Sequence, residues 1–201
     1  MFLIGLTGGI AAGKSAVAEH WVKLGAIEID ADLLAREVVA KETPGAKQVE
    51  EAFGSDFFVN GELDRKKLGQ LVFANPEKLN QLEAIVHPLV KQRARELIAA
   101  VQDTAIVIYT VPLLVEAQVE LPFDAVVTIE APEDERVKRL VKNRGMTEAE
   151  AVSRIRAQAT PLERATRADH ILSSNQSLAL LLHDAEVLFH RFVLANEAKS
   201  E

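Results

Sequence analysis

The chain has 201 residues, of which 48% are apolar and 26% are charged, and it contains no cysteine. This length fits one sizeable core with small insertions, and the lack of cysteine excludes disulfides, thiolate metal sites and cysteine nucleophiles. The net charge of −7 argues against a general nucleic-acid-binding protein, so we expect no nucleic-acid partner.

The first elements in the chain surround a glycine-rich loop. Residues 2–7 (FLIGLT) predict a buried strand, and apolar side chains at helical spacing over 14–25 predict a helix. Between them, residues 8–15 read GGIAAGKS and match the pattern G-x-x-x-x-G-K-[ST]. A strand, a glycine-rich turn and a helix in this order are the setting that such a loop requires.

The chemistry of this loop is that of a nucleotide site. Its backbone N–H groups and the helix N-terminus together attract an anion, and Gly8 and Gly13 allow the backbone angles that the loop needs. Lys14 is placed to reach the β- and γ-phosphates, and Ser15 to bind Mg²⁺. The loop therefore predicts binding of a nucleoside triphosphate.

A second strand is predicted at 26–30, and two aspartates mark its end. Asp30 and Asp32 stand where open α/β sheets bind ligands, at the carboxyl end of a strand. Either aspartate is a candidate N-cap for the helix that follows, and the other is then available as a general base.

Two insertions interrupt the alternation of strands and helices. Residues 31–104 separate the second and third strands, far more than the dozen or so that a crossover needs. This segment is mostly helical by its pattern, over 63–73 and 77–101. A second insertion, 144–165, contains a basic helix over 147–158. Either both insertions close over ligands or both only pack against the core.

The remaining elements complete an α/β fold with a parallel sheet of about five strands flanked by helices. Strands are predicted at 105–111, 125–131 and 168–174, and helices at 133–143 and 177–194. We expect a nucleotide-binding core formed by 1–30, 105–143 and 166–201, a helical insertion at 31–104 and a lid at 144–165.

The charges are unevenly distributed along the chain. Residues 133–167 contain nine Lys or Arg and six acidic residues, which suggests a binding site for an anionic small molecule. A solvated helix face with mixed charges explains the pattern equally well.

The longest apolar stretch, 105–115, is too short to span a bilayer and contains Pro112. With no signal-peptide pattern at the N-terminus, we expect a cytoplasmic protein without a membrane partner. Nothing in the sequence indicates an oligomeric state.

The motifs narrow the class of nucleotide-binding protein. The strings D-x-x-G and N-K-x-D, which a regulatory GTPase needs, are absent. Chain length, two insertions and a basic segment favour a small-molecule kinase, in which a basic lid covers the transferring phosphoryl group and excludes water. A nucleotide-binding regulator without catalytic activity, and a kinase for another small alcohol or nucleotide, stay as alternatives.

The chain resembles the dephospho-CoA kinase family over nearly its whole length. The segments that carry the resemblance are, in order, LTGGIAAGKS (6–15), IDAD (29–32), LDRKKLGQLVF (63–73), LEAIVHPLV (82–90), VPLLVE (111–116), RLVKNRG (139–145), RIRAQ (154–158) and ADHILSSN (168–175). The resemblance implies a P-loop kinase fold with a helical coenzyme-A-binding insertion and a lid. It also implies ATP-dependent phosphorylation of the ribose 3′-hydroxyl of dephospho-coenzyme A, the last step of coenzyme A synthesis, with Mg²⁺ as cofactor.

The resemblance further implies roles for individual residues. Asp32 becomes the general base on the 3′-hydroxyl and forms the catalytic set together with Lys14, Arg139 and Arg144. Asp32, Arg65 and His87 become substrate contacts and Ser15 the metal ligand. The residues implied in ATP binding are Gly8, Gly9, Ile10, Ala11, Ala12, Gly13, Lys14, Ser15, Ala16, Arg144 and Asn175.

Some implied roles stay open or depart from the family pattern. A histidine at a helix end before Pro88 explains His87 equally well, and Glu116 is a candidate for a helix cap or for a position near magnesium. No acid ends the third strand, so magnesium is expected on Ser15, phosphates and waters. Three further departures are alanine at 11 and 12 where Gly or Ser is frequent, Ala16 in place of a common Thr, and Arg164 in place of a frequent Lys.

The spacing of the two lid arginines makes a local prediction. Arg139 and Arg144 are five residues apart, which puts them on different sides of one continuous helix. Both can face one ligand if the helix ends near the sequence NRG at 143–145. We therefore expect Arg139 inside a helix and Arg144 at or beyond its end.

Overall fold

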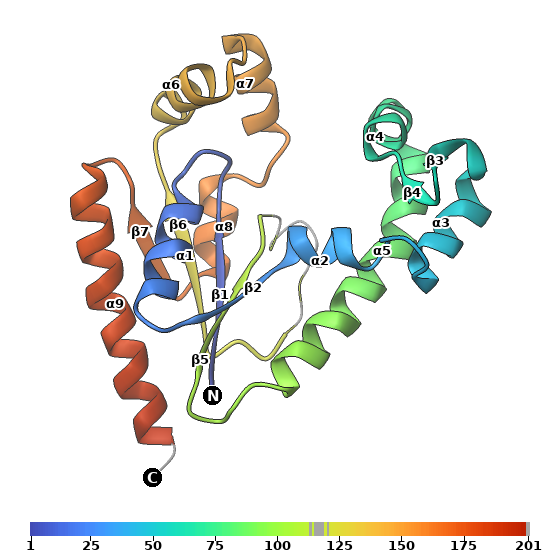
Figure 1. Ribbon diagram of the computed structural model, residues 1–201. Helices are drawn as coiled ribbons and strands as arrows, with labels where there is room; N and C mark the ends of the chain where they lie inside the picture. The colour runs from blue at the N-terminus through green and yellow to red at the C-terminus, as the bar shows by residue number, and fades with distance from the viewer. Residues whose placement is uncertain (113, 115–118, 120, 200–201) are drawn as a thin grey trace. The chain divides into compact units, whose positions relative to one another are not determined.

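The computed structural model describes residues 1–112, 114, 119 and 121–199. The chain divides into two compact units: unit 1 consists of Met1–Ile29 and Val101–Glu201, and unit 2 of Asp30–Ala100 (Figure 1). The functional division into a core, an insertion at 31–104 and a lid at 144–165 stays a prediction.

Unit 1 is built on a five-stranded sheet with the order β2-β5-β1-β6-β7. Strand β1 pairs in parallel with β5 and with β6, and β6 pairs in parallel with β7. All five predicted strands are present, and the predicted α/β fold is confirmed. The strands are β1 (Phe2–Gly8), β2 (Ile27–Asp30), β5 (Ile106–Thr110), β6 (Ala125–Glu130) and β7 (His170–Ser173).

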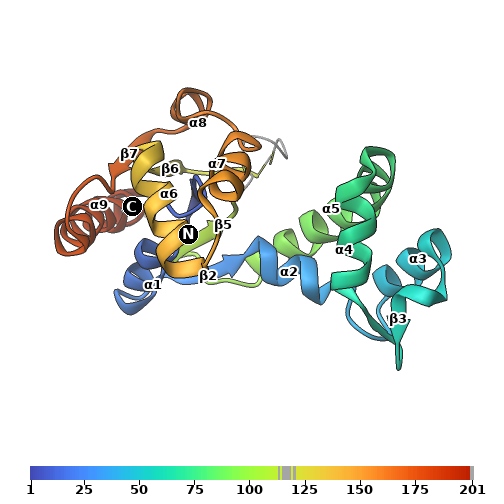
Figure 2. The same cartoon turned by 90° about the horizontal axis from the view of Figure 1, so that it is seen from above.

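The central strand β1 is buried over its whole length, as expected for a strand covered on both faces of a parallel sheet. On one face, helices α1 (Lys14–Lys23) and α9 (Leu178–Lys199) pack against alternate residues of the strands (Figure 1). Trp21 of α1 is fully buried there, and its Nε1 donates to the carbonyl oxygen of Ala185 at 2.8 Å. Helix α8 (Pro161–Arg167) contacts β6 from the other side of the sheet (Figure 2).

Two further helices stand at the carboxyl end of β6. Helix α6 (Glu133–Arg144) ends at Gly145, which adopts a left-handed conformation with φ of 63°. Helix α7 (Glu148–Arg156) then begins with a capping box formed by Thr147 and Glu150. Arg139 lies inside α6 and Arg144 is its last residue, so the prediction that the helix ends at this point is confirmed.

Unit 2 is mostly helical, as predicted for the segment between the second and third strands. Its core consists of Val39, Val49, Leu68 and Val72 with partly buried neighbours. Its helices are α2 (Ala31–Glu37), α3 (Pro44–Phe53), the 3₁₀ helix η1 (Ser55–Phe57), α4 (Arg65–Ala74) and α5 (Pro76–Ala99).

Unit 2 also contains a small hairpin that was not predicted. Strands β3 (Phe58–Val59) and β4 (Glu62–Leu63) pair antiparallel around Asn60 and Gly61, which have φ of 53° and 80°. Two central residues with positive φ are typical of a tight hairpin turn, and Asn-Gly is its preferred sequence.

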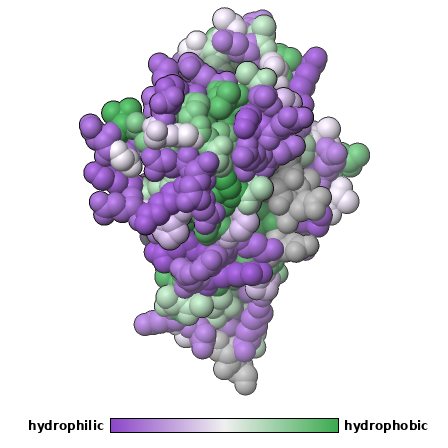
Figure 3. Space-filling view, turned by 90° about the vertical axis from the view of Figure 1, so that its right-hand side faces the viewer, coloured by the Kyte–Doolittle hydropathy of each residue, from purple (hydrophilic) through white to green (hydrophobic). Residues whose placement is uncertain are grey.

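Figure 3 shows one face, on which hydrophilic side chains cover most of the area and apolar side chains show between them. Among the described residues, no helix combines the length and the apolar composition needed to cross a membrane.

Candidate functional site

The glycine-rich loop connects β1 to α1, as predicted. Gly8 needs to be glycine because a Cβ there would lie 2.7 Å from the carbonyl oxygen of Ile129 on the paired strand β6. Gly13 is the N-cap of α1 and has φ of 107°, a left-handed conformation that favours glycine. The loop turns on itself through a hydrogen bond from the N–H of Ala12 to the carbonyl of Gly9, at 2.9 Å.

Ala11 and Ala12 contribute differently to the shape of this loop. Ala11 has φ of 61°, which costs a residue other than glycine about 1 kcal/mol or more. Its methyl group packs with Ile10 against a cluster built on Leu140 of α6 and Ile155 of α7. Ala12 is 1% exposed and belongs to the main core. Ala11 therefore packs the loop against α6 and α7, and Ala12 packs it against the main core. The packing of Ala11 stabilises its strained conformation.

Arg139 ties the loop to the end of β7. Its Nη1 donates to the carbonyl oxygen of Ala11 at 3.2 Å and to Oγ of Ser174 at 2.9 Å. Its Nη2 donates to the carbonyl oxygen of Ser174 at 2.7 Å, and the Ser174 hydroxyl itself donates to the carbonyl of Ala12. The carbonyl groups of Ala11 and Ala12 are thus held by side-chain donors from outside the loop.

The segment after α7 also contacts the loop. The N–H of Ile10 donates to Oε1 of Gln158 at 2.8 Å. Gln158 stands two residues before Thr160, whose capping box with Glu163 begins α8. A side chain from the predicted lid therefore binds the backbone of the glycine-rich loop.

A buried ion pair lies beside the loop at the end of β6. Arg164 of α8 is 2% exposed, and its Nε and Nη2 donate to the two carboxylate oxygens of Glu130 at 2.6 and 2.7 Å. The Thr128 hydroxyl donates to the same carboxylate at 2.7 Å. Because two guanidinium nitrogens each bind one carboxylate oxygen, the contact between Arg164 and Glu130 is bidentate and charge-assisted.

The other residues predicted for unit 1 lie at the ends of helices and strands. Lys14 and Ser15 are the first two residues of α1, and Ser15 is exposed. Ala16 donates its N–H to the carbonyl of Gly13 at 3.1 Å, which closes the first turn of that helix. Arg144 and Asn175 are exposed at the ends of α6 and β7.

Strand β5 ends without an acidic residue, but the carboxylate of Glu28 lies next to its last residue, Thr110. The buried hydroxyl of Thr110 donates to Oε1 of Glu28, from the neighbouring strand β2, at 2.9 Å. In the part of the chain that the structure describes, no three His, Cys, Asp or Glu side chains gather into a metal-binding group. Glu116 lies outside the described residues.

In unit 2, the structure distinguishes the two aspartates of the IDAD segment. Oδ1 of Asp30 accepts the N–H groups of Asp32 and Leu33, at 2.7 and 3.2 Å, so Asp30 is the N-cap of α2. Asp32 lies in the first turn of this helix and is exposed.

Arg65 and His87 belong to the helices of unit 2. Arg65 begins α4, and its Nη2 donates to the carbonyl oxygen of Arg36 of α2 at 2.9 Å. Burial, followed by the positive charge of Arg36, lowers the pKa of Arg65. His87 is exposed within α5, which continues past Pro88, so the alternative of a histidine at a helix end is wrong.

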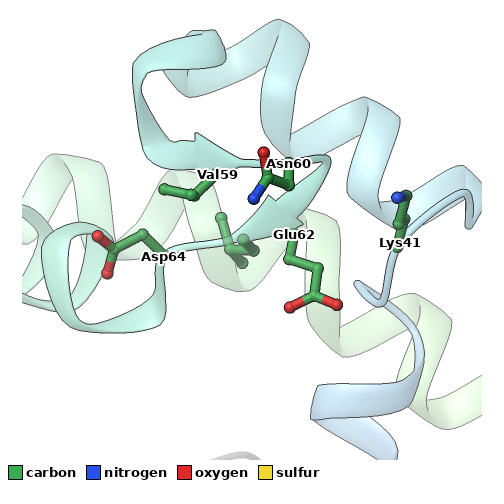
Figure 4. A pocket seen from close by; sticks show the side chains of 6 residues that line it. Lys41, Val59, Asn60, Glu62 and Asp64 are labelled. Carbon is green, nitrogen blue, oxygen red and sulfur yellow. The ribbon is translucent and has the colours of Figure 1, made fainter.

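Unit 2 has a pocket beside its hairpin, which Figure 4 shows. Glu62 and Asp64 point in different directions there, and Asp64 accepts the N–H of Lys67 as the N-cap of α4. The pocket measures about 420 Å³ and is lined by Lys41, Val59, Asn60, Glu62, Leu63 and Asp64.

Several residues at the loop were not singled out from the sequence. Glu130, Arg136, Gln158 and Ser174 all contact the loop or its supports, although Gln158 and Ser174 lie within segments that carry the family resemblance. One signal was present: Arg136 is one helical turn before Arg139, so both face the same way on α6.

Comparisons with known proteins agree on one family. The family model for dephospho-CoA kinase matches residues 2–179. A dephospho-CoA kinase from Streptomyces avermitilis is 50% identical over 179 residues, which are 89% of this chain and 87% of that protein. One from Thermobifida fusca is 44% identical over 176 residues, 87% of this chain and 88% of the relative.

The comparison of structures gives the same result for the fold. A solved structure from Thermus thermophilus has a TM-score of 0.81 and 33% identity, and the match covers 94% of this chain and 97% of the other. A shikimate kinase from Bacteroides thetaiotaomicron, 17% identical with a TM-score of 0.55, covers 94% of this chain and 98% of its own, and supports the kinase fold alone.

We expect the substitution Glu130→Gln to lower the free energy of unfolding by about 3–5 kcal/mol, because it leaves the buried guanidinium of Arg164 without its counter-charge. The matched control is Asp134→Asn, whose carboxylate is 3.4 Å from the exposed Lys138. An exposed pair of this kind contributes little to the free energy of unfolding. Urea unfolding of both variants measures the difference, and equal stabilities would show that the buried pair contributes nothing.

Proposed function

This chain belongs to the dephospho-CoA kinase family, and from that membership we propose which of its residues carry out the reaction. The chain is a kinase, a transferase of the family that completes coenzyme A biosynthesis: it phosphorylates the ribose 3′-hydroxyl of dephospho-coenzyme A. The observation that carries the residue assignment is the difference between Asp30, which caps a helix, and Asp32, which is exposed beside it.

ATP is proposed to bind at the loop 8–15. The loop's N–H groups and the positive end of the α1 dipole attract the phosphates, and the Lys14 ammonium neutralises charge on the phosphoryl group during transfer. Asn175 and Arg144, exposed at the ends of β7 and α6, are proposed for the adenine and phosphate side. Arg139 is proposed as a catalytic residue, and its contacts to the loop carbonyls support an effect through the loop's shape.

Magnesium is proposed as the cofactor, with the hydroxyl of Ser15 as its protein ligand. Ser15 is exposed at the N-terminus of α1, so its hydroxyl is accessible to an ion next to the loop. Mg²⁺ prefers oxygen ligands, keeps several waters and is commonly bound through few protein groups together with substrate phosphates. The residues present fit this mode. When bound, the ion supplies charge neutralisation at the phosphate oxygens.

Asp32 is proposed as the general base on the 3′-hydroxyl. Its exposed carboxylate is able to orient the hydroxyl and to take its proton late in the transfer. In this step the hydroxyl oxygen forms the bond to the γ-phosphorus as the bond from that phosphorus to the β–γ bridging oxygen breaks. The proton passes to Asp32, and ADP leaves.

The other assignments concern the acceptor and the surroundings of the site. Arg65 and His87 are proposed to contact dephospho-coenzyme A, and unit 2 to be its binding insertion. Residues 144–165 are proposed to act as a lid that excludes water, and the bond between Gln158 and Ile10 supports a coupling of this segment to the loop. We also propose a cytoplasmic location, in keeping with a chain that contains no cysteine.

Lys14→Ala is expected to leave a folded protein whose turnover is lower by several orders of magnitude. Removal of the cation at the transferring phosphoryl group costs about 3–5 kcal/mol of transition-state stabilisation. The matched control is Lys23→Ala, at the exposed end of the same helix, which keeps its activity. A coupled assay of ADP release measures both, and one tenth of wild-type activity in Lys14→Ala would exclude a catalytic loop.

Asp32→Asn is expected to lower kcat by roughly 10²–10⁴-fold, because the amide keeps the shape of the side chain and cannot take the proton. Its affinity for ATP should stay within a few-fold of wild type, since the loop holds the nucleotide. The experiment measures turnover of dephospho-coenzyme A together with ATP binding by calorimetry.

Asp30→Asn is the matched control for this substitution. Asn and Asp are about equally good N-caps, so α2 is preserved and the loss of turnover is expected to be smaller. If Asp30→Asn proves the more damaging of the two variants, the roles of the two aspartates are reversed.

A further inference from the structure

Arg136 is a buried arginine whose hydrogen bonds are incomplete. Its side chain is 3% exposed, and among the described residues its Nε and Nη1 have no hydrogen-bond partner. Burial, followed by the positive charge of Arg164, lowers its pKa. Buried N–H groups of a guanidinium that lack hydrogen-bond partners are energetically costly and rare in folded proteins, so these two nitrogens call for an explanation.

The guanidinium of Arg136 packs against the phosphate-binding loop. A Cβ on Gly9 would collide with Nη1 of Arg136 and would come within 3.1 Å of Nη2 of Arg164. A larger residue at this position would require the two guanidinium groups to move. The second residue of the loop is therefore in direct contact with buried positive charge.

The carboxylates near Arg136 are already engaged with other arginines. Glu130 binds Arg164 through both of its oxygens, and Glu133 is 3.7 Å from Nε of Arg156. Both carboxylates act on Arg136 at a distance, and neither forms a hydrogen bond with its Nε or Nη1. These two carboxylates thus balance the positive charge at the back of the loop only in part.

We propose that Arg136 is a positioning residue for the triphosphate of ATP. Its guanidinium supplies a buried positive charge behind Gly9, and the bound phosphates balance that charge. Charge acts over longer range in a buried, poorly solvated place than in water, so the side chain needs no direct contact with the phosphates. The free protein carries the energetic penalty of this arginine, and binding of the phosphates relieves it. The proposal rests on the proposed site of ATP at loop 8–15.

The test measures binding of the non-hydrolysable analogue adenylyl-imidodiphosphate by calorimetry, in the presence of Mg²⁺. Arg136→Met, which keeps the length and removes the charge, is expected to weaken binding about tenfold. Arg136→Lys, which restores the charge, is expected to bind within about threefold of wild type. The matched control is Lys138→Met, which removes one charge from an exposed position of the same helix and is expected to bind as wild type does.

The outcome separates a role in nucleotide binding from a purely structural role. A purely structural arginine leaves the affinity of Arg136→Met within twofold of wild type, or makes Arg136→Lys as weak as Arg136→Met, and either result overturns the proposal. If Arg136→Met does not fold, Arg136→Gln replaces it in the same comparison. No acceptor is present, so a wrong assignment of the acceptor or of Asp32 leaves this result unaffected, whereas failure of wild type to bind the analogue rejects the ATP site itself.

Discussion

The shape of the loop between β1 and α1 is the constraint on which the rest of unit 1 depends. Backbone N–H groups bind phosphate only when the chain takes angles that most residues disfavour, and here Gly13 and Ala11 both have positive φ. Arg139 of α6, Ser174 after β7 and Gln158 after α7 hold the loop from outside. Helices and strands far apart in the sequence thus meet at one short turn.

This constraint explains why the loop itself is predictable from the sequence, whereas most of the side chains that hold it are not. The pattern at 8–15 and the apolar runs around it predict loop, strand and helix together, because all three depend on neighbouring residues. The partners of the loop come from residues 130–174, and no local pattern tells which side chain faces inward. Arg164 is an example. The sequence shows only that an arginine stands where a lysine is frequent, whereas the burial of Arg164 against Glu130 depends on the packed sheet.

In unit 2, local sequence signals are sufficient to predict the hairpin, but they do not show which aspartate caps α2. Asn60-Gly61 is a strong hairpin signal, yet the predicted elements include no strands at 58–63, where β3 and β4 pair. Asp30 and Asp32 are equally good candidates for a helix cap by residue type, so the sequence alone does not decide between them. The bonds to Oδ1 of Asp30 decide between them, and they depend on where α2 begins.

The account is tested most directly by the choice of acceptor. ADP production is measured with dephospho-coenzyme A, AMP, shikimate and gluconate as alternative acceptors, and the position of the new phosphate is determined by NMR. We predict efficient turnover of dephospho-coenzyme A alone, with the phosphate on the ribose 3′-oxygen. Comparable efficiency with any other acceptor, or a phosphate at another position, would contradict the account.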